Sequence, residues 1–265
     1  MLWIKLLAVL MLVAVGVVVG RRVGKGRKWW AGVGGSFLLV SLVIVGRRSE
    51  YLAFVWPFSW AISPHVGPLM MGWAIPVMLG VLIARLPERR KRVMVGMLTV
   101  VALVYFGVLP VVLPLAVRGS LLRTATVVDN NGVCRQQHGY SCGPAAAVTC
   151  LRVLEVEGQE GNIGALAETA PTLGTDGRML AKAVEKLYGN QGVRYTYRYV
   201  SRLEDLRVPA VTAIFLPKYG GHWVAVLAVE EDGVVVGDPL SGQERWDWQT
   251  FLDQWRGATV EIFMK

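Results

Sequence analysis

The chain has 265 residues, of which 54% are hydrophobic, and its formal net charge at pH 7 is +9. Residues 1–128 hold 15 Lys and Arg against 2 Asp and Glu, a net charge of +13, whereas residues 129–265 hold 13 against 17, a net charge of −4. A net positive charge that lies entirely in the apolar half is typical of a membrane protein and not of a nucleic-acid-binding protein. We therefore expect a lipid bilayer and no nucleic acid as a partner.

Four apolar segments within residues 1–120 predict an all-α region of about four transmembrane helices. They are Leu2–Gly20, Ala31–Val45, about Pro68–Ala84 and Val93–Val117. A cleaved signal peptide is the alternative for the first segment, but it lacks a basic start and a small-residue cleavage site. The aromatic stretch Tyr51–His65 is expected to lie at the membrane interface, although a fifth span there stays open.

The basic loops predict the orientation in the membrane. Arg21–Lys28 and Arg85–Arg92 each carry five Lys or Arg, more than the pair Arg47–Arg48. Because basic loops stay in the cytoplasm, four spans place the C-terminal half outside the cell, and a fifth span would reverse that side. We expect a multi-pass protein of the cell membrane with an extracytoplasmic C-terminal domain.

Residues 121–265 are predicted to form the second domain, with helices first and strands after them, the order of an α+β fold. Helical spacing of apolar residues is found at Cys142–Val156, Ile163–Ala170 and Met179–Tyr188. Alternating apolar runs then predict five strands, which are Val193–Val200, Ala210–Leu216, Trp223–Val229, Val234–Val236 and Thr259–Met264.

The segment from Gln136 to Ala147 combines residue types that suit an activated thiol. Cys142 opens an alanine-rich helix, whose unpaired N–H groups and dipole favour a thiolate. Pro144 fits the first helical turn, and Gly143 lets a substrate backbone come close. Gln136 can place its amide beside the Cys142 N–H, as a second donor to an oxyanion. The alternative is a structural thiol that caps the helix.

A thiol nucleophile also needs a base and a group that orients the base. His222 begins one alternating run and Asp238 ends the next, with a Glu-Asp-Gly turn between them, so both lie on one predicted hairpin. The sequence leaves the register of that hairpin open, and Asp238 could instead belong to an Asp-Pro turn. His138 competes with His222 as the base, and Gln137 competes with Gln136 as the donor.

Three segments, in this order, resemble the bacteriocin-processing peptidase family. They are Cys134–Ala147, Gly221–Val226 and Gly237–Leu240, and the resemblance covers about residues 130–265. Members of that family are papain-like cysteine peptidases. Many of them form the domain of a peptide exporter that cleaves leader peptides after a double glycine. The resemblance therefore implies a papain-like cysteine peptidase domain at residues 121–265.

Carried over by position, the resemblance implies that Cys142 is the nucleophile and Gln136 the oxyanion donor. It implies further that His222 is the base and Asp238 its orienter. The substrate-binding positions expected beside these four residues are Tyr140, Gly143, Gly221 and Trp223.

Two features depart from the exporter-linked members. Ser141 stands where they often carry an aspartate, and Gly20–Gly26 lacks the spacing of a phosphate-binding loop, so we expect no ATP-binding domain. The predicted function is a membrane-anchored cysteine endopeptidase for leader or secreted peptides, with a separate peptide exporter as a candidate partner. Two alternatives stay open, an inactive peptide-binding module and another thiol acyl-transfer enzyme such as a transamidase or deamidase.

No metal or other cofactor is expected. Cys134, Cys142 and Cys150 are spaced by eight residues and lack the Cys-x₂-Cys spacing of zinc sites. Cys150 is expected to be a buried apolar residue of the helix. A disulfide between Cys134 and Cys150 stays open for a domain in an oxidising compartment.

Overall fold

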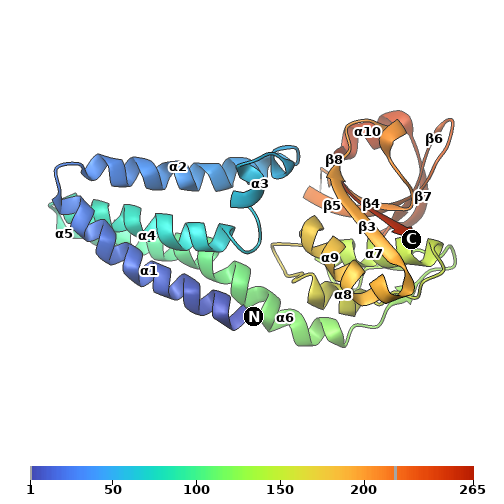
Figure 1. Cartoon of the computed structure of the whole chain (residues 1–265), viewed down its shortest axis with the longest axis horizontal. Coiled ribbons are helices and arrows are strands. Elements are labelled where there is room, and N and C mark those ends of the chain that lie inside the picture. The colour runs from blue at the N-terminus through green and yellow to red at the C-terminus, as the bar shows by residue number, and fades with distance from the viewer. Residues whose placement is uncertain (1, 218–219) are drawn as a thin grey trace. The chain divides into compact units, whose positions relative to one another are not determined.

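The computed structural model describes residues 2–217 and 220–265 and divides into two compact units, one ending at residue 115 and one beginning at residue 116 (Figure 1). The first unit contains helices and the second contains both sheets. This confirms the predicted fold class, an N-terminal all-α region followed by an α+β domain. The predicted domain boundary at residue 120 lies inside α6 (Leu109–Leu122), the helix that runs from one unit into the other.

Within the described residues, four helical segments are long and apolar enough to span a membrane. Three of them are α1 (Leu2–Lys25), α2 (Trp29–Arg48) and α4 (Gly67–Arg85). The fourth segment comprises α5 (Arg89–Leu103), a π-helical turn and α6. The aromatic stretch before α4 holds two short helices of three and four residues, η1 (Leu52–Phe54) and α3 (Phe58–Ala61), which add no fifth candidate span.

Helix α1 packs against α4 through small residues. Gly16, Gly20 and Gly24 recur every fourth position and so share one face of α1. A Cβ added to Gly20 would lie 2.3 Å from the Val77 carbonyl oxygen, so only glycine permits this approach of the two backbones. At the end of α4, the Arg85 Nε donates to the Gly24 carbonyl over 2.6 Å and satisfies a carbonyl at the end of α1.

The second unit is built on a six-stranded antiparallel sheet with the order β3-β8-β4-β5-β6-β7. Two further short strands, β1 (Val127–Val128) and β2 (Cys134–Arg135), pair with each other. The strands of the large sheet are β3 (Val193–Tyr199), β4 (Ala210–Leu216), β5 (Gly220–Val229), β6 (Gly233–Asp238), β7 (Gly242–Asp247) and β8 (Trp255–Met264). The sequence did not predict β7, because this edge strand is mostly polar.

Helices cover both faces of the sheet (Figure 1). On one face lie α7 (Cys142–Val153), α8 (Glu160–Leu166) and α9 (Gly177–Tyr188), which share a buried cluster with Val211, Ala225 and Val260. On the other face, Phe251 of α10 (Trp248–Gln254) packs with Ile214, Val224 and Val236. Helix α8 begins three residues before the predicted start at Ile163, which makes Glu160 its first residue.

Candidate active site

Cys142 is the first residue of α7 and is buried, with 8% of its surface exposed. The residue before it, Ser141, makes no side-chain capping hydrogen bond to the helix. Pro144 has no N–H group to be satisfied. The N–H groups of Cys142 and Gly143 therefore stay uncapped, and the Cys142 sulfur lies at the positive end of the helix dipole.

His222 and Asp238 lie on neighbouring strands, β5 and β6, whose register shifts at a β-bulge. Val229 pairs with Val234, but Val226 pairs with Val236, so one extra residue of β5 bulges between these pairs. Beyond the bulge, the continued register places Asp238 opposite residue 224. Because side chains two residues apart share a face, His222 and Asp238 are diagonal neighbours on one face of the sheet.

The His222 imidazole and the Asp238 carboxylate form a buried pair. His222 Nε2 lies 2.7 Å from Asp238 Oδ1, and the Leu240 N–H donates to the same oxygen over 2.8 Å. Burial raises the pKa of Asp238, but the hydrogen bonds from His222 and from the Leu240 N–H outweigh it and hold that pKa below its usual value. The carboxylate therefore stays charged and fixes the imidazole ring.

The same pair sets the charge of His222. Burial lowers the pKa of His222, but hydrogen bonds to Asp238 and Cys142 outweigh it and raise that pKa from 6.5 to about 9. With Nε2 facing Asp238, the second ring nitrogen, Nδ1, is available to the Cys142 thiol. The arrangement can hold a proton on the imidazole between a sulfur and a carboxylate at neutral pH.

Gln136 lies in the loop between β2 and α7. Its Nε2 donates to the His138 carbonyl over 2.8 Å, and its backbone N–H donates to the Pro239 carbonyl over 3.1 Å. Because the amide nitrogen carries two protons, one remains for a ligand. The competing Gln137 is exposed, and its amide donates to the Arg135 carbonyl. The competing base, His138, bonds through Nε2 to the Thr124 hydroxyl at 2.9 Å.

Two of the other predicted site residues, Gly143 and Trp223, contact Thr175, a residue that the sequence did not identify. A Cβ added to Gly143 would lie 3.0 Å from Thr175 Cβ, and the Trp223 indole donates to the Thr175 carbonyl over 3.0 Å. A Cβ added to Gly221 would have no other atom within 4 Å, so the space beside this residue is open. Tyr140 stacks on the His138 ring at 5.2 Å between ring centroids and so packs within the loop before α7.

The remaining two thiols are free and fully buried. Burial raises the pKa of Cys134 to about 12 and also raises the pKa of Cys150. Neither is therefore a thiolate at neutral pH, which leaves Cys142 as the candidate nucleophile. Among the described residues, no group of three or more His, Cys, Asp and Glu side chains is arranged to hold a metal ion.

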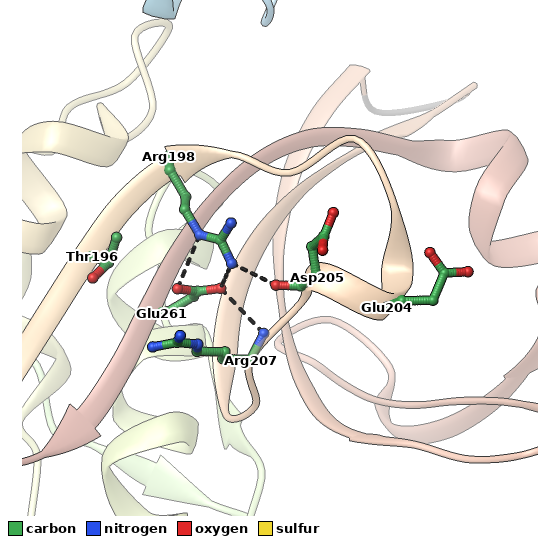
Figure 2. A pocket seen from close by; sticks show the side chains of 6 residues that line it. All are labelled: Thr196, Arg198, Glu204, Asp205, Arg207 and Glu261. Carbon is green, nitrogen blue, oxygen red and sulfur yellow. Dashed lines mark hydrogen bonds and ion pairs between the residues drawn. The ribbon is translucent and has the colours of Figure 1, made fainter.

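A hollow of about 420 Å³ lies elsewhere on the domain, and Figure 2 shows the side chains around it. Its lining residues are Thr196, Arg198, Glu204, Asp205, Arg207 and Glu261. The Arg198 guanidinium donates to both oxygens of the buried Glu261 carboxylate, which also accepts the Arg207 N–H. Thr196 and Arg198 alternate along β3 with Tyr195 and Tyr197, which pack toward the helices. The hollow thus surrounds a structural ion pair on the far face of β3.

A thiol at a helix start, an imidazole on a strand and a carboxylate beside that imidazole define the class of cysteine peptidases. The chain belongs to the peptidase C39 family, since the sequence model of that family matches residues 130–265. The resemblance to bacteriocin-processing peptidases seen in the sequence is thereby confirmed.

Individual proteins are similar to somewhat less than half of the chain. An uncharacterized protein of Methanothermobacter marburgensis is 33% identical over 115 residues, which are 43% of this chain and 75% of that protein. The probable functional amyloid protease FapD of Pseudomonas aeruginosa is 26% identical over 132 residues, 48% of this chain and 58% of its own length.

Two solved structures are similar to the same domain at 18% sequence identity. The peptidase domain of Streptococcus ComA, a bi-functional ABC transporter, has a TM-score of 0.44 and covers 54% of this chain and 100% of its own. A double glycine motif protease from an AMS/PCAT transporter, in complex with the leader peptide, has a TM-score of 0.42 and covers 54% and 96%.

Proposed function

We propose that this protein is a membrane-anchored cysteine endopeptidase that uses Cys142, His222 and Asp238 as a triad and Gln136 as an oxyanion donor. The observation that carries the proposal is the buried 2.7 Å pair of His222 and Asp238. The Cys142 thiol at the start of α7 also raises the pKa of this imidazole. Membership of the peptidase C39 family supports the same reaction class.

In the proposed reaction, the Cys142 proton moves to His222, and the sulfur attacks the carbonyl carbon of a peptide bond. The negative charge on the carbonyl oxygen is stabilised by the Cys142 N–H and by the free proton of the Gln136 amide. When the tetrahedral intermediate collapses, His222 gives its proton to the leaving amine. Water, deprotonated by His222, then hydrolyses the thioester, which releases the acid and restores the thiol.

The substrate of this reaction is proposed to be a leader peptide or a secreted peptide. The open space beside Gly221 would admit a peptide backbone, whereas the space beside Gly143 is filled by Thr175. A separate peptide exporter is a proposed partner. We also propose that the peptide is cleaved after a double glycine, as the resemblance to bacteriocin-processing peptidases implies.

The substrate can be identified by comparing new protein N-termini in cells that carry the wild-type chain and cells that carry Cys142→Ala. We expect a defined set of N-termini that depends on Cys142, because hydrolysis leaves a free amine at each cleaved bond. Peptides modified at the acyl side by an added amine would indicate a transamidase instead. An identical set of N-termini in both strains would contradict the proposal.

The chain is proposed to cross the membrane four times, with residues 121–265 on the extracytoplasmic side. Support comes from four candidate spans and from the basic loops 21–28 and 85–92, which are expected to stay in the cytoplasm. A C-terminal fusion to a reporter that is active only in the cytoplasm should therefore stay inactive. Activity of that reporter would reverse the orientation, and the same reporter after residue 26 serves as the cytoplasmic control.

A further inference from the structure

A buried carboxylate beside the nucleophile has no part in the reaction described above. Glu160, the first residue of α8, is 0% exposed. None of the described residues places a Lys or Arg nitrogen within ion-pair distance of it. A carboxylate buried without a cation is costly, since it loses its hydration with no opposite charge in exchange. A fold that retains Glu160 must gain something from its hydrogen bonds.

The hydrogen bonds of Glu160 lead to the loop that carries the nucleophile. Its Oε1 accepts from the Ser141 hydroxyl over 2.6 Å and from the Gln137 N–H over 3.1 Å. The second oxygen, Oε2, is buried without a partner. Burial raises the pKa of Glu160, and the hydrogen bonds from Ser141 and Gln137 oppose that rise. Both donors belong to the loop between β2 and α7, so Glu160 holds that loop at two points.

Glu160 is itself held firmly. Its backbone N–H donates to the Thr126 hydroxyl over 2.9 Å. A Cβ added to the next residue, Gly161, would lie 2.1 Å from the Leu121 carbonyl oxygen, so the start of α8 is pressed against the end of α6. The carboxylate can therefore act as a fixed support for the loop.

The hydrogen bond to Glu160 also keeps the Ser141 hydroxyl from capping helix α7. A serine before a helix ordinarily accepts a hydrogen bond from an N–H group of the first turn. Here the hydroxyl donates to Glu160 Oε1 over 2.6 Å, with the His138 carbonyl at 3.0 Å as a second acceptor, and it accepts from the His138 N–H over 3.1 Å. The N–H groups of Cys142 and Gly143 are left without a side-chain cap and are free for a developing oxyanion.

The same loop connects Ser141 to the second oxyanion donor. The His138 carbonyl accepts from the Ser141 N–H over 3.1 Å and from the Gln136 Nε2 over 2.8 Å. Hydrogen bonds thus run from Glu160 through Ser141 and His138 to the Gln136 amide. A shift of Ser141 would move the Cys142 N–H and the Gln136 amide together.

We propose that Glu160, acting through Ser141, is a positioning residue that holds the two oxyanion donors of this site in place. The inference rests on the proposed function, because an oxyanion hole matters only where a thiol attacks a carbonyl. It goes beyond that function because Glu160 touches neither the thiol nor the base.

Two small reagents distinguish a defect in the oxyanion hole from a defect in the reactivity of the thiol. Acylation of Cys142 by p-nitrophenyl acetate passes through a tetrahedral oxyanion, whereas alkylation by iodoacetamide displaces iodide without one. In the full chain in detergent micelles, Glu160→Ala and Ser141→Ala should lower the acylation rate about 10- to 100-fold, less than the loss of a whole donor. The alkylation rate should stay within about 3-fold of the wild type.

Variants of neighbouring residues provide the controls. Glu160→Gln keeps an oxygen that can accept from Ser141 and should retain more acylation than Glu160→Ala. Because Glu160 acts through Ser141, the double variant should be no slower than the slower single variant. In the Gln136→Ala background, Glu160→Ala should lower the acylation rate by a smaller factor than it does in the wild type. Glu157→Ala, an exposed acid three residues earlier, should leave both rates unchanged.

Equal loss of acylation and alkylation in Glu160→Ala would overturn the inference, since it would indicate a purely structural role. Unchanged acylation, or additive losses in the double variant, would overturn it as well. The proposed function fails separately, if Cys142→Ala leaves both reactions of the chain intact.

Discussion

Replacement of Cys142 by alanine is expected to lower kcat/KM for peptide hydrolysis by about 10⁴-fold or more. The substitution removes the thiol that, together with Asp238, raises the pKa of the buried His222 imidazole. His222→Ala should cost about as much, because the thiol would lose its base and the leaving amine its acid. The peptides identified by the comparison of N-termini serve as substrates.

The double variant of Cys142 and His222 should be no slower than either single variant, since residues that act as a unit are strongly non-additive. Cys150→Ala is the matched control. It removes a fully buried thiol eight residues further along α7 and should change activity less than about 3-fold, at a small cost in stability. Retained hydrolysis in Cys142→Ala, or an equal loss in Cys150→Ala, would contradict the assignment.

The chemistry of the thiol could be predicted from the sequence because it depends on local features. Cys142 begins a helix at Gly143 and Pro144, and these residue types allow little else. His222 begins an alternating run, which is an equally local signal. Both elements are present, with a helix at Cys142–Val153 that ends three residues before the predicted end and a strand at Gly220–Val229 that begins three residues before the predicted start.

The approach of Asp238 to His222 could not be predicted, because it depends on the β-bulge. A regular hairpin continued from the pair of Val229 and Val234 would place Asp238 opposite Ala225, on the other face from His222. One extra residue, Leu227, shifts the register by one and brings the carboxylate to the imidazole. The sequence of β5 is apolar on both sides of this residue and gives no signal for the shift.

Glu160 was missed for a different reason. It lies in a polar stretch next to glycine, which is typical of a solvated helix start, and the helix was predicted to begin at Ile163. Its burial depends on contacts from distant parts of the chain, namely Thr126, Ser141 and the carbonyl of Leu121. Tertiary contacts of this kind cannot be derived from local pattern.

Replacement of Asp238 by asparagine is expected to change the pH dependence of the reaction as well as its rate. The pKa of His222 is raised to about 9, and the hydrogen bond to Asp238 is the first of the contacts that oppose the effect of burial. A neutral amide at residue 238 cannot stabilise an imidazolium, so that pKa should fall. We expect kcat/KM at neutral pH to drop by about 10²- to 10⁴-fold.

The alkaline limb of kcat/KM, the pH at which it falls on the alkaline side, tests the role of Asp238 more directly than the rate at neutral pH does. In the wild type, His222 keeps its proton up to about pH 9, and the limb should lie there. In Asp238→Asn it should move to lower pH, because the imidazole loses its proton earlier. Asp253→Asn, at an exposed position of α10, should leave the limb in place.

Stability gives an independent measure of the same pair. Because folding raises the pKa of His222, its stabilising contribution is complete below about pH 6.5 and is lost as the pH rises through about 9. Thermal unfolding of the wild type should therefore shift to lower temperature over that range, and Asp238→Asn should show a smaller shift. If the variant keeps both the alkaline limb and the full shift, Asp238 does not control the charge of His222. The carboxylate would then only shape the turn at Pro239.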